Sequence, residues 1–334
     1  MTKQVPHVKR NVAKIIATYI VVGGMAFLFL FDIAAVLLRN HLADRFPVSP
    51  EMFQGGGEAA RFHFLNVSNG DCILLESHGR FALIDAGWGS DNPIEAVRRP
   101  GYEQRVLEYL RRVAADEHGT VHLDFIKPSH YHYDHVGGFE AILSASDIQV
   151  GRVYLPPRPE YGSQAWYLPV LRRRIEDAAH ARGFAIVEDL PTEPFYHGAM
   201  RLQFLNTAFC PDRNENDNSI VTLAEYGQFR ALFTGDIYAA WGLERSIARQ
   251  AGPVDLLKLP HHGYTLSSSA YFLRTLRPSL AVVTNFPGRV YPNVMWNLTF
   301  ITRTPTLSTV QENGIIVTVS DNYQMAVTGN LHLS

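Results

Sequence analysis

Four side chains of metal-binding type stand within six positions, in the run SHYHYDHVGG at residues 129–138. His130, His132, Asp134 and His135 supply imidazole and carboxylate groups, which are the ligands that a borderline ion such as Zn²⁺ accepts. A divalent charge makes it tolerable to gather these groups in one loop. A solvated histidine-rich loop is the alternative, but the spacing H-x-H-x-D-H followed by two glycines is far more specific than a count of histidines. The pattern therefore predicts a metal site.

The segments around this cluster indicate which elements position it. The cluster directly follows the strand-like stretch LDFIK, so we expect it at the carboxyl end of a strand, where open α/β sheets commonly carry their chemistry. From Arg61 onward, short β-type runs alternate with helical patterns. Helices are expected near 102–117, 164–182, 237–250 and 267–276. An early run of strands followed by βα units predicts mixed sheets layered with helices.

Composition and charge restrict the class of protein. The chain has 334 residues, of which 46% are hydrophobic and 19% charged, which is ordinary for a globular enzyme. The formal net charge is −2, so no global basic field indicates a nucleic-acid partner, and any anion-binding surface must be local. The two cysteines, Cys72 and Cys210, cannot build a disulfide framework, and we interpret both as small core hydrophobes.

The N-terminal region predicts a membrane anchor. Residues 15–31 contain no charged residue, and the apolar run resumes after Asp32 as far as Leu38. These 24 positions would reach about 36 Å as a helix, more than the roughly 30 Å of a bilayer core. The run is also longer than the core of a cleaved signal peptide. The alternative is a buried helix or a segment that is not inserted, which would leave the chain cytoplasmic.

Charge around this segment and composition after it set its orientation and the division of the chain. The basic residues that precede the segment are Lys3, Lys9, Arg10 and Lys14. The positive-inside tendency then keeps the N-terminus cytoplasmic and places the rest outside. We divide the chain into a basic tail (1–14), a transmembrane or signal-anchor helix (15–38), a linker rich in proline and glycine (39–60) and one folded domain (61–334).

The cluster at 129–138 resembles the metal-binding signature of the metallo-β-lactamase superfamily, and other landmarks of that family appear in order along the chain. LIDAGWG resembles the early strand that ends in a structural aspartate, here Asp85. LFTGD resembles the strand that ends in an aspartate bridging two metals, here Asp236. LKLPHHGY resembles the last ligand strand. Because family members often have glycine directly after the ligand, His262 is the better match, and His261 would line the site.

Within the superfamily, the resemblance is strongest to the metallo-β-lactamase-like domain of ComEC-type DNA-uptake competence proteins. Three segments carry it: FHFLNVSNGDCILLESHGRFALIDAG, NDNSIVTL and TVQENGIIVTV. The match extends over about residues 61–320. It implies a hydrolase domain of α/β class, a four-layer αββα sandwich with a metal site at one edge of the two sheets.

Two departures from the family pattern concern one metal and the substrate. Many members supply a further histidine near the run NENDNS, whereas only His180 and His197 occur in that interval here, both well upstream. Either another side chain substitutes or one metal has fewer ligands. The candidates for a substitute are Asn214, Asn216, Asp217 and Asn218. The competence-type His-Pro is Tyr291-Pro292 here, which leaves the substrate open.

The resemblance implies a site for two divalent metal ions. Its ligands would be His130 and His132 for one ion, Asp134, His135 and His262 for the second, and Asp236 as the bridge. Zinc is the first candidate ion and manganese the second. Metal binding lowers the pKa of a bound water toward about 7, which gives a hydroxide nucleophile at neutral pH. The catalytic residues would be Asp134, His261 and Asp236.

Phosphoester cleavage suits such a pair of ions, because they neutralise both the attacking and the leaving oxygens. The first hypothesis is therefore a metal-dependent phosphodiesterase or nuclease that acts on a phosphodiester or nucleic-acid substrate. Candidate phosphate contacts are Lys258, Arg213 and Arg289. Candidate base-stacking side chains are Tyr131, Tyr133, Tyr264 and Tyr291. A small ester, lactone or β-lactam hydrolase is the second hypothesis, and a non-catalytic metal-binding module is the third. The oligomeric state and the polarity of cleavage stay open.

Overall fold

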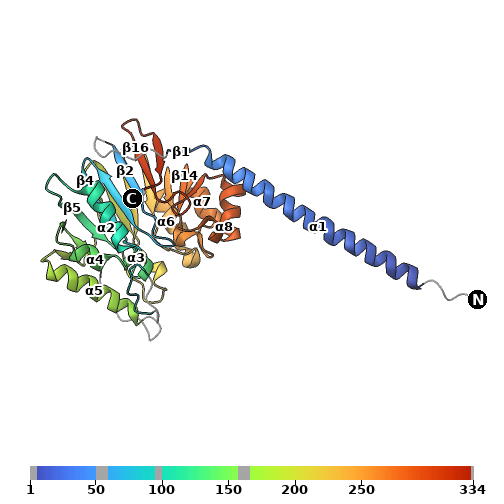
Figure 1. The fold of residues 1–334 in the computed structure, drawn as a ribbon, viewed down its shortest axis with the longest axis horizontal. Coiled ribbons are helices and arrows are strands. Elements are labelled where there is room, and N and C mark those ends of the chain that lie inside the picture. The colour runs from blue at the N-terminus through green and yellow to red at the C-terminus, as the bar shows by residue number, and fades with distance from the viewer. Residues whose placement is uncertain (1–5, 50–58, 95–99, 157–165, 332–334) are drawn as a thin grey trace, which may run out of the picture.

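The computed structural model describes residues 6–49, 59–94, 100–156 and 166–331. One long helix, α1 (Pro6–Ala43), projects from a domain of packed sheets and helices (Figure 1). The helix begins inside the expected tail, includes the whole apolar segment 15–38 and ends four residues beyond Arg39, inside the expected linker. Residues 50–58 of that linker lie outside the described residues. The segment Ala17–Ala43 is long and apolar enough to cross a membrane.

The first sheet has ten strands in the described residues, in the order β1-β17-β16-β2-β3-β4-β5-β7-β8, with β6 beside β5. Strands β2, β3 and β4 form an antiparallel meander, and β5 lies parallel to β4. The strand bounds are β1 (Val48–Ser49), β2 (Ala60–Phe64), β3 (Ile73–Ser77), β4 (Arg80–Ile84), β5 (Val121–Lys127), β6 (Ile148–Val150), β7 (Val153–Tyr154), β8 (Ile186–Val187), β16 (Ile315–Val319) and β17 (Met325–Gly329).

The second sheet has seven strands in the same described ranges, in the order β15-β14-β13-β12-β11-β10-β9. Strands β9 to β12 pair antiparallel, and strands β12 to β15 pair parallel. The bounds are β9 (Phe195–His197), β10 (Met200–Leu205), β11 (Val221–Tyr226), β12 (Phe229–Phe233), β13 (Leu256–Lys258), β14 (Leu280–Val283) and β15 (Thr306–Ser308).

Side chains alternate along the strands, so each sheet packs one face against the other sheet and its opposite face against helices. In β3, Ile73 and Leu75 point into the layer between the sheets, whereas Leu74 points to the helices on the other face, as the period of two along a strand requires. Phenylalanines from both sheets meet in the inner layer, where the rings of Phe62 and Phe229 stack at 5.8 Å. The two sheets therefore form the middle of a sandwich.

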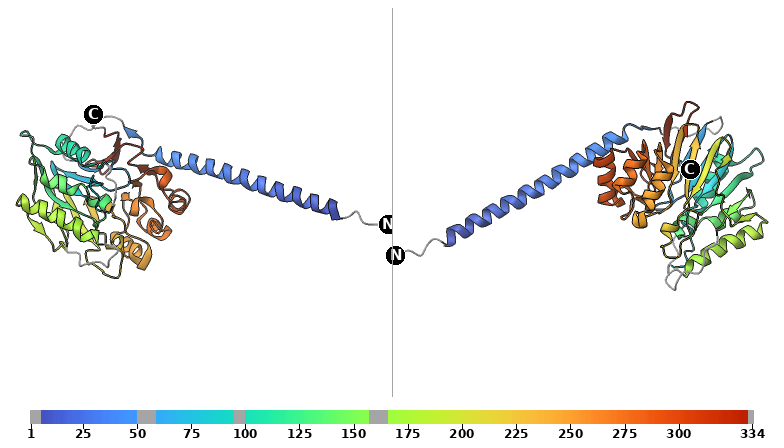
Figure 2. Two further views of the ribbon diagram at one scale, coloured as in Figure 1. Left: turned by 60° about the horizontal axis from the view of Figure 1, so that its bottom comes forward. Right: turned by 180° about the vertical axis from the view of Figure 1, so that it is seen from behind.

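Helices cover both outer faces, which confirms the expected four-layer αββα arrangement (Figure 2). The first sheet is covered by α2 (Glu103–Ala114), α4 (Phe139–Ser144) and α5 (Tyr167–Ala181), and the second by α6 (Leu243–Ala251), α7 (Ala270–Leu276) and α8 (Pro292–Trp296). Shorter helical turns are α3 (Tyr133–Val136), η2 (Asn216–Asn218), η3 (Ala240–Gly242), η4 (Pro260–Gly263), η5 (Pro287–Arg289) and η6 (Asn297–Thr302). Of the helix expected at 164–182, residues 164 and 165 lie outside the described residues.

The two cysteines differ in environment. Cys72 lies in the core beneath α2 as expected, whereas Cys210 is only partly buried in the loop after β10. The backbone N–H of Cys210 donates to the side chain of Asn218 at 2.8 Å, so this residue closes a loop rather than filling the core.

Candidate metal centre

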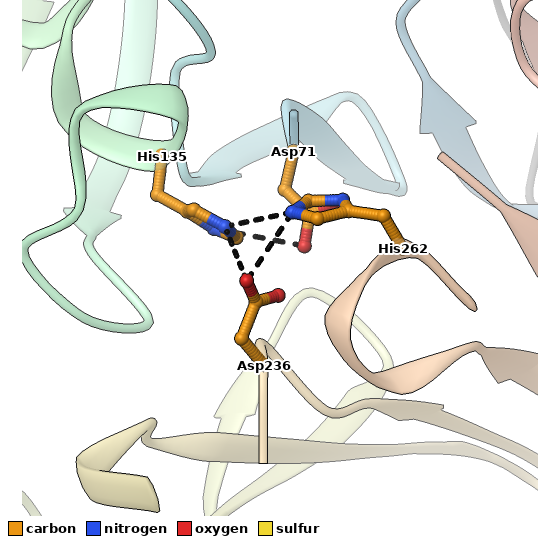
Figure 3. A group of neighbouring side chains, drawn as sticks. All are labelled: Asp71, His135, Asp236 and His262. Carbon is orange, nitrogen blue, oxygen red and sulfur yellow. Dashed lines mark hydrogen bonds and ion pairs between the residues drawn. The ribbon is translucent and has the colours of Figure 1, made fainter. Parts of the chain in front are cut away.

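Side chains from four separate loops meet at one edge of the sandwich (Figure 3). Asp71 lies between β2 and β3, His135 in α3, Asp236 after β12 and His262 in η4. All four are buried, and ligand-type atoms of the four lie within 4.8 Å of one another. The sequence predicts three of these residues as ligands and not Asp71.

One set of donor atoms has the spacing of a tetrahedral ion site. The Nε2 atoms of His135 and His262 lie 3.2 Å apart, and Oδ2 of Asp236 lies 3.2 and 3.3 Å from them. Oδ2 of Asp134 lies 3.3 Å from Nε2 of His262 and 3.8 Å from Nε2 of His135. Ligands placed tetrahedrally around Zn²⁺ are roughly 3.3–3.6 Å apart. His135, His262, Asp236 and Asp134 therefore fit a divalent ion in chemistry, and all but one of these separations are close to the spacing of its ligands.

A second donor set adjoins the first. Nε2 of His130 lies 2.9 Å from Nδ1 of His132 and 3.9 Å from Oδ2 of Asp236. The His130 and His135 rings are 4.1 Å apart between centroids. The Asp236 oxygen is thus shared by both sets, which suits two neighbouring ions. His130 is fully buried, and His132 is only partly buried.

The ring nitrogens that point away from the first set are held by oxygen atoms. Nδ1 of His135 lies 2.9 Å from Oδ2 of Asp85. Nδ1 of His262 lies 2.9 Å from the hydroxyl of Thr284 and 3.3 Å from Oδ1 of Asp71. Such partners fix the tautomer and orientation of a ligand imidazole. Asp71 and Asp85 therefore lie behind the imidazoles and leave both Nε2 atoms facing inward.

A close backbone approach brings Asp71 into this position. The N–H of Asp71 donates to the carbonyl oxygen of Asp134 at 3.2 Å. A Cβ on the preceding Gly70 would lie 2.5 Å from that same oxygen, so glycine is required there. An aspartate between a glycine and the apolar strand β3 was the available signal for Asp71. It is weak, because its partners Lys258 and His262 lie far along the chain.

Lys258 is fully buried beneath the centre, although the sequence suggests it as a phosphate contact. Its ammonium group forms an ion pair with the carboxylate of Asp71 and lies 3.4 Å from Oδ1 of Asp236. It also donates to the carbonyl oxygen of Gly235 at 3.0 Å. Burial alone would lower the pKa of Lys258, but the carboxylates of Asp71 and Asp236 have the larger effect and raise this pKa above its usual value. Lys258 is therefore a fixed cation within the structure and not a contact for substrate.

The centre is rich in negative charge. Burial would lower the pKa of His135, but the carboxylates of Asp236, Asp134 and Asp85 raise it to about 10. Burial would raise the pKa of Asp236, yet its cationic neighbours hold it well below the usual range. In the absence of an ion, protons on the imidazoles balance these acids. A divalent ion would have to replace those protons, as ligand imidazoles bind in the neutral form.

The loop around η2 does not identify a substitute for the missing histidine. Oδ1 of Asn214 accepts from the N–H of Asp217 at 2.9 Å, and Oδ1 of Asp217 accepts from the N–H of Tyr238 at 2.9 Å. The amide of Asn216 donates to the Tyr238 hydroxyl at 2.7 Å. Oδ1 of Asn216 and Oδ2 of Asp217 are buried and have no hydrogen-bond partner among the described residues. These two oxygens are the atoms of this loop that are left for a further contact.

His261 lies beside the centre and not within either donor set. Its φ of 50° and the φ of 51° at His262 are sparsely populated for residues with a side chain. The His261 ring packs on Tyr238 and Tyr264, with centroids 4.9 and 5.3 Å away. Burial lowers the pKa of His261, so its imidazole is neutral near pH 7. Its buried Nδ1 has no hydrogen-bond partner among the described residues.

The remaining candidate substrate contacts differ in how deeply their side chains are buried. The hydroxyl of Tyr131 donates to the carbonyl oxygen of Pro156 at 2.8 Å, and both Tyr131 and Tyr133 are core residues. Neither is available to stack on a base. Tyr264 and Tyr291 lie edge to face with centroids 6.0 Å apart and are accessible to solvent. Arg289 is exposed, whereas Arg213 is partly buried and lies within hydrogen-bonding distance of Asn206.

Comparisons with known proteins agree with this fold. Residues 65–283 match the family model of the metallo-beta-lactamase superfamily. The chain is 28% identical over 231 residues to Recombination protein 2 of Haemophilus influenzae, which covers 68% of this chain and 24% of that protein. It is 22% identical over 274 residues to ComE operon protein 3 of Bacillus subtilis, which covers 77% of this chain and 34% of that protein. The chain thus spans about a quarter to a third of the length of these relatives.

A solved structure supports the same fold. The metallo-beta-lactamase fold protein YhfI from Bacillus subtilis matches with a TM-score of 0.50 at 14% identity. The match covers 78% of this chain and 99% of that one. The family match extends from the end of β2 to the end of β14, which includes every loop of the metal centre. The chain belongs to the metallo-beta-lactamase superfamily and is similar to ComEC-type competence proteins.

Proposed function

We propose that this chain is a metal-dependent phosphodiesterase or nuclease held at a membrane. The observation that carries the proposal is the pair of donor sets that share Oδ2 of Asp236, within 3.9 Å of an imidazole nitrogen on either side. Two neighbouring divalent ions are typical of enzymes that cleave phosphodiesters. Superfamily membership supports a metal-dependent hydrolase, and the shared carboxylate favours the phosphodiester among its substrates.

From the two donor sets we infer a role for each predicted ligand. One ion would be held by His130 and His132, the other by Asp134, His135 and His262, and Asp236 would contact both. When bound, such ions supply an acidified water as nucleophile and positive charge beside the substrate phosphate. Asp85 and Asp71 would keep the two inner imidazoles in the orientation that binds an ion.

Other residues around the centre would act on the substrate or its protons. His261 is neutral near pH 7, because burial lowers its pKa, so it would accept a proton at the edge of the site. Tyr264 and Tyr291 would flank a nucleotide or another substrate group at the entrance.

The named relatives add support of a different kind. Recombination protein 2 has a name that refers to recombination, which supports DNA as the substrate. The apolar helix α1 supports membrane anchoring, and the basic residues before it favour a catalytic domain outside the cytoplasm. Zinc is the first ion to test and manganese the second.

The proposal is tested with purified full-length protein in detergent, loaded with zinc or manganese. Substrates are single- and double-stranded DNA, bis-p-nitrophenyl phosphate and a chromogenic β-lactam. We expect diester cleavage that is lost in Asp134→Ala and Asp236→Ala, with the circular dichroism spectrum unchanged. The control is Asp147→Ala, because Asp147 pairs with Arg111 on an exposed surface and should not affect turnover. Hydrolysis of the β-lactam alone, or inertness of metal-loaded protein on all substrates, would refute the proposal.

A further inference from the structure

Helix α1 is free along its first part and docks on the domain from Phe31 onward. Residues 17–30 are exposed. The Phe31 ring stacks on Trp296 and Phe300, with centroids 5.8 and 5.4 Å away. Ala35, Leu38 and Leu42 follow on the same helical face and are partly or fully buried. Figures 1 and 2 show the same arrangement, with α1 passing α8 and then projecting away from the domain.

The free apolar length is too short to cross a bilayer. The apolar run begins at Ile15, directly after Lys14, and Phe31 lies 16 residues later. That length is about 24 Å in a helix, whereas the hydrocarbon layer is about 30 Å thick. A tilted helix would need still more residues. If α1 spans the membrane, the domain surface that touches Phe31 must therefore reach the edge of the hydrocarbon.

The outer face of α1 supports this depth. Ile33, Val36 and Leu37 follow Phe31 and are exposed, on the side of the helix turned away from the domain. Three apolar side chains exposed in this way would be unfavourable in water, and lipid would cover them. Beyond Phe31, the exposed side of the helix thus carries these three apolar side chains as well as Asp32, while its other side contacts the domain.

The domain surface beside α1 has the composition of a membrane interface. Phe286, Tyr291 and Trp296 are 40, 43 and 48% exposed; they lie before η5, before α8 and at the end of α8. Arg289 and Arg303 are exposed on the same segment, and the Arg289 guanidinium lies 5.1 Å from the centre of the Phe286 ring. Aromatic rings together with arginine are enriched where proteins meet the headgroup region.

We propose that the segment 286–303, which includes η5, α8 and η6, is a membrane-contact surface. Trp296 and Phe300 lie at the edge of the hydrocarbon, and Arg289 and Arg303 meet the phosphates of lipid headgroups. The inference rests on the anchoring role of α1 in the proposed function. It adds that the domain lies against the bilayer and does not hang free on a tether. Since Tyr291 packs on Tyr264 beside the metal centre, the entrance of the centre would face the membrane surface.

The test uses tryptophan fluorescence of the full chain in proteoliposomes of phosphatidylcholine and phosphatidylglycerol, with and without bromine on the acyl chains near the headgroup. The three proteins are the natural chain, Trp296→Phe and Trp166→Phe. Trp166 is the matched control, because it is 54% exposed and directly precedes α5, a helix that Figure 1 shows on the side of the domain away from α1. Flotation with the liposomes checks the anchor separately, and the diester assay in detergent checks the catalytic proposal.

We expect bromine to quench the tryptophan fluorescence of the natural chain. Trp296→Phe should reduce the quenched part of the fluorescence by roughly twofold or more, and Trp166→Phe should leave it unchanged. Equal quenching in Trp296→Phe and the natural chain, in protein that floats, would overturn the surface while leaving the anchor intact. Protein that does not float would overturn both. Trp296 fluorescence that is not quenched by bromine but changes with protein concentration would instead indicate contact between two copies, and would contradict the proposal.

Discussion

Replacement of Lys258 by methionine should strongly destabilise the metal-free protein. Lys258 is fully buried, and its ammonium group is the cation between the buried carboxylates of Asp71 and Asp236. Methionine keeps most of the side-chain volume but leaves both carboxylates without this countercharge. Removal of one partner from a buried ion pair typically costs about 3–5 kcal/mol, and we expect a loss in this range in the free energy of unfolding.

Two further changes identify charge as the cause. Bound zinc brings its own positive charge beside Asp236, so the loss should be smaller in metal-loaded protein. The double variant Lys258→Met with Asp71→Asn removes one of the stranded charges, so it should be more stable than Lys258→Met alone. Neither recovery is expected if methionine merely packs badly.

Urea unfolding in detergent, followed by near-ultraviolet circular dichroism with and without chelator, measures these differences. The control is Arg111→Met, because Arg111 pairs with Asp147 on the surface, where an ion pair contributes about 0–1 kcal/mol. A loss in Lys258→Met no larger than the loss in Arg111→Met would refute this view of the buried pair. So would a double variant that is less stable than Lys258→Met.

Three other predictions concern protons and metal affinity. Surrounding carboxylates raise the pKa of His135 to about 10 and raise that of His262, so metal uptake near pH 7 should release protons. Calorimetry in buffers of different ionisation enthalpy measures this release, and its absence would contradict the prediction. Burial lowers the pKa of His63 below its ordinary 6.5, so the folded state binds fewer protons than the unfolded state below pH 6.5, and stability should fall as pH falls from 6.5 toward the lowered pKa. His63→Gln should flatten that part of the profile, and an unchanged slope in urea unfolding would count against it. Asp85→Asn should weaken zinc binding about 10–100-fold in equilibrium dialysis, since Asp85 orients His135, and unchanged affinity would argue against that role.

Local patterns made part of the fold and site predictable. The strands show clear apolar patterns, and the cluster at 129–138 lies within one loop, so its spacing is visible in the sequence. The end of helix α1 was harder to predict from the sequence. Its last residues have a polar composition typical of a linker, yet Leu42 is buried against the domain, and this tertiary contact keeps the segment helical.

Contacts between distant segments of the chain limited how much of the site could be predicted. Asp71 and Lys258 are separated by most of the domain along the chain, and neither residue alone indicates that they pair beneath the metal centre. Lys258 next to a ligand motif looked available to a phosphate, because burial cannot be read from a single charged residue. Tyr131 and Tyr133 were ambiguous for the same reason, and their positions in the core resolve it.

The metal content of the folded protein tests the central claim most directly. Full-length protein is loaded with zinc, dialysed without chelator and analysed by inductively coupled plasma mass spectrometry, beside an Asp236→Asn variant. Two donor sets that share one carboxylate predict about two ions per chain, and fewer in the variant. Natural protein that is folded but retains no ion, or an Asp236→Asn variant that retains as much as the natural chain, would contradict the account.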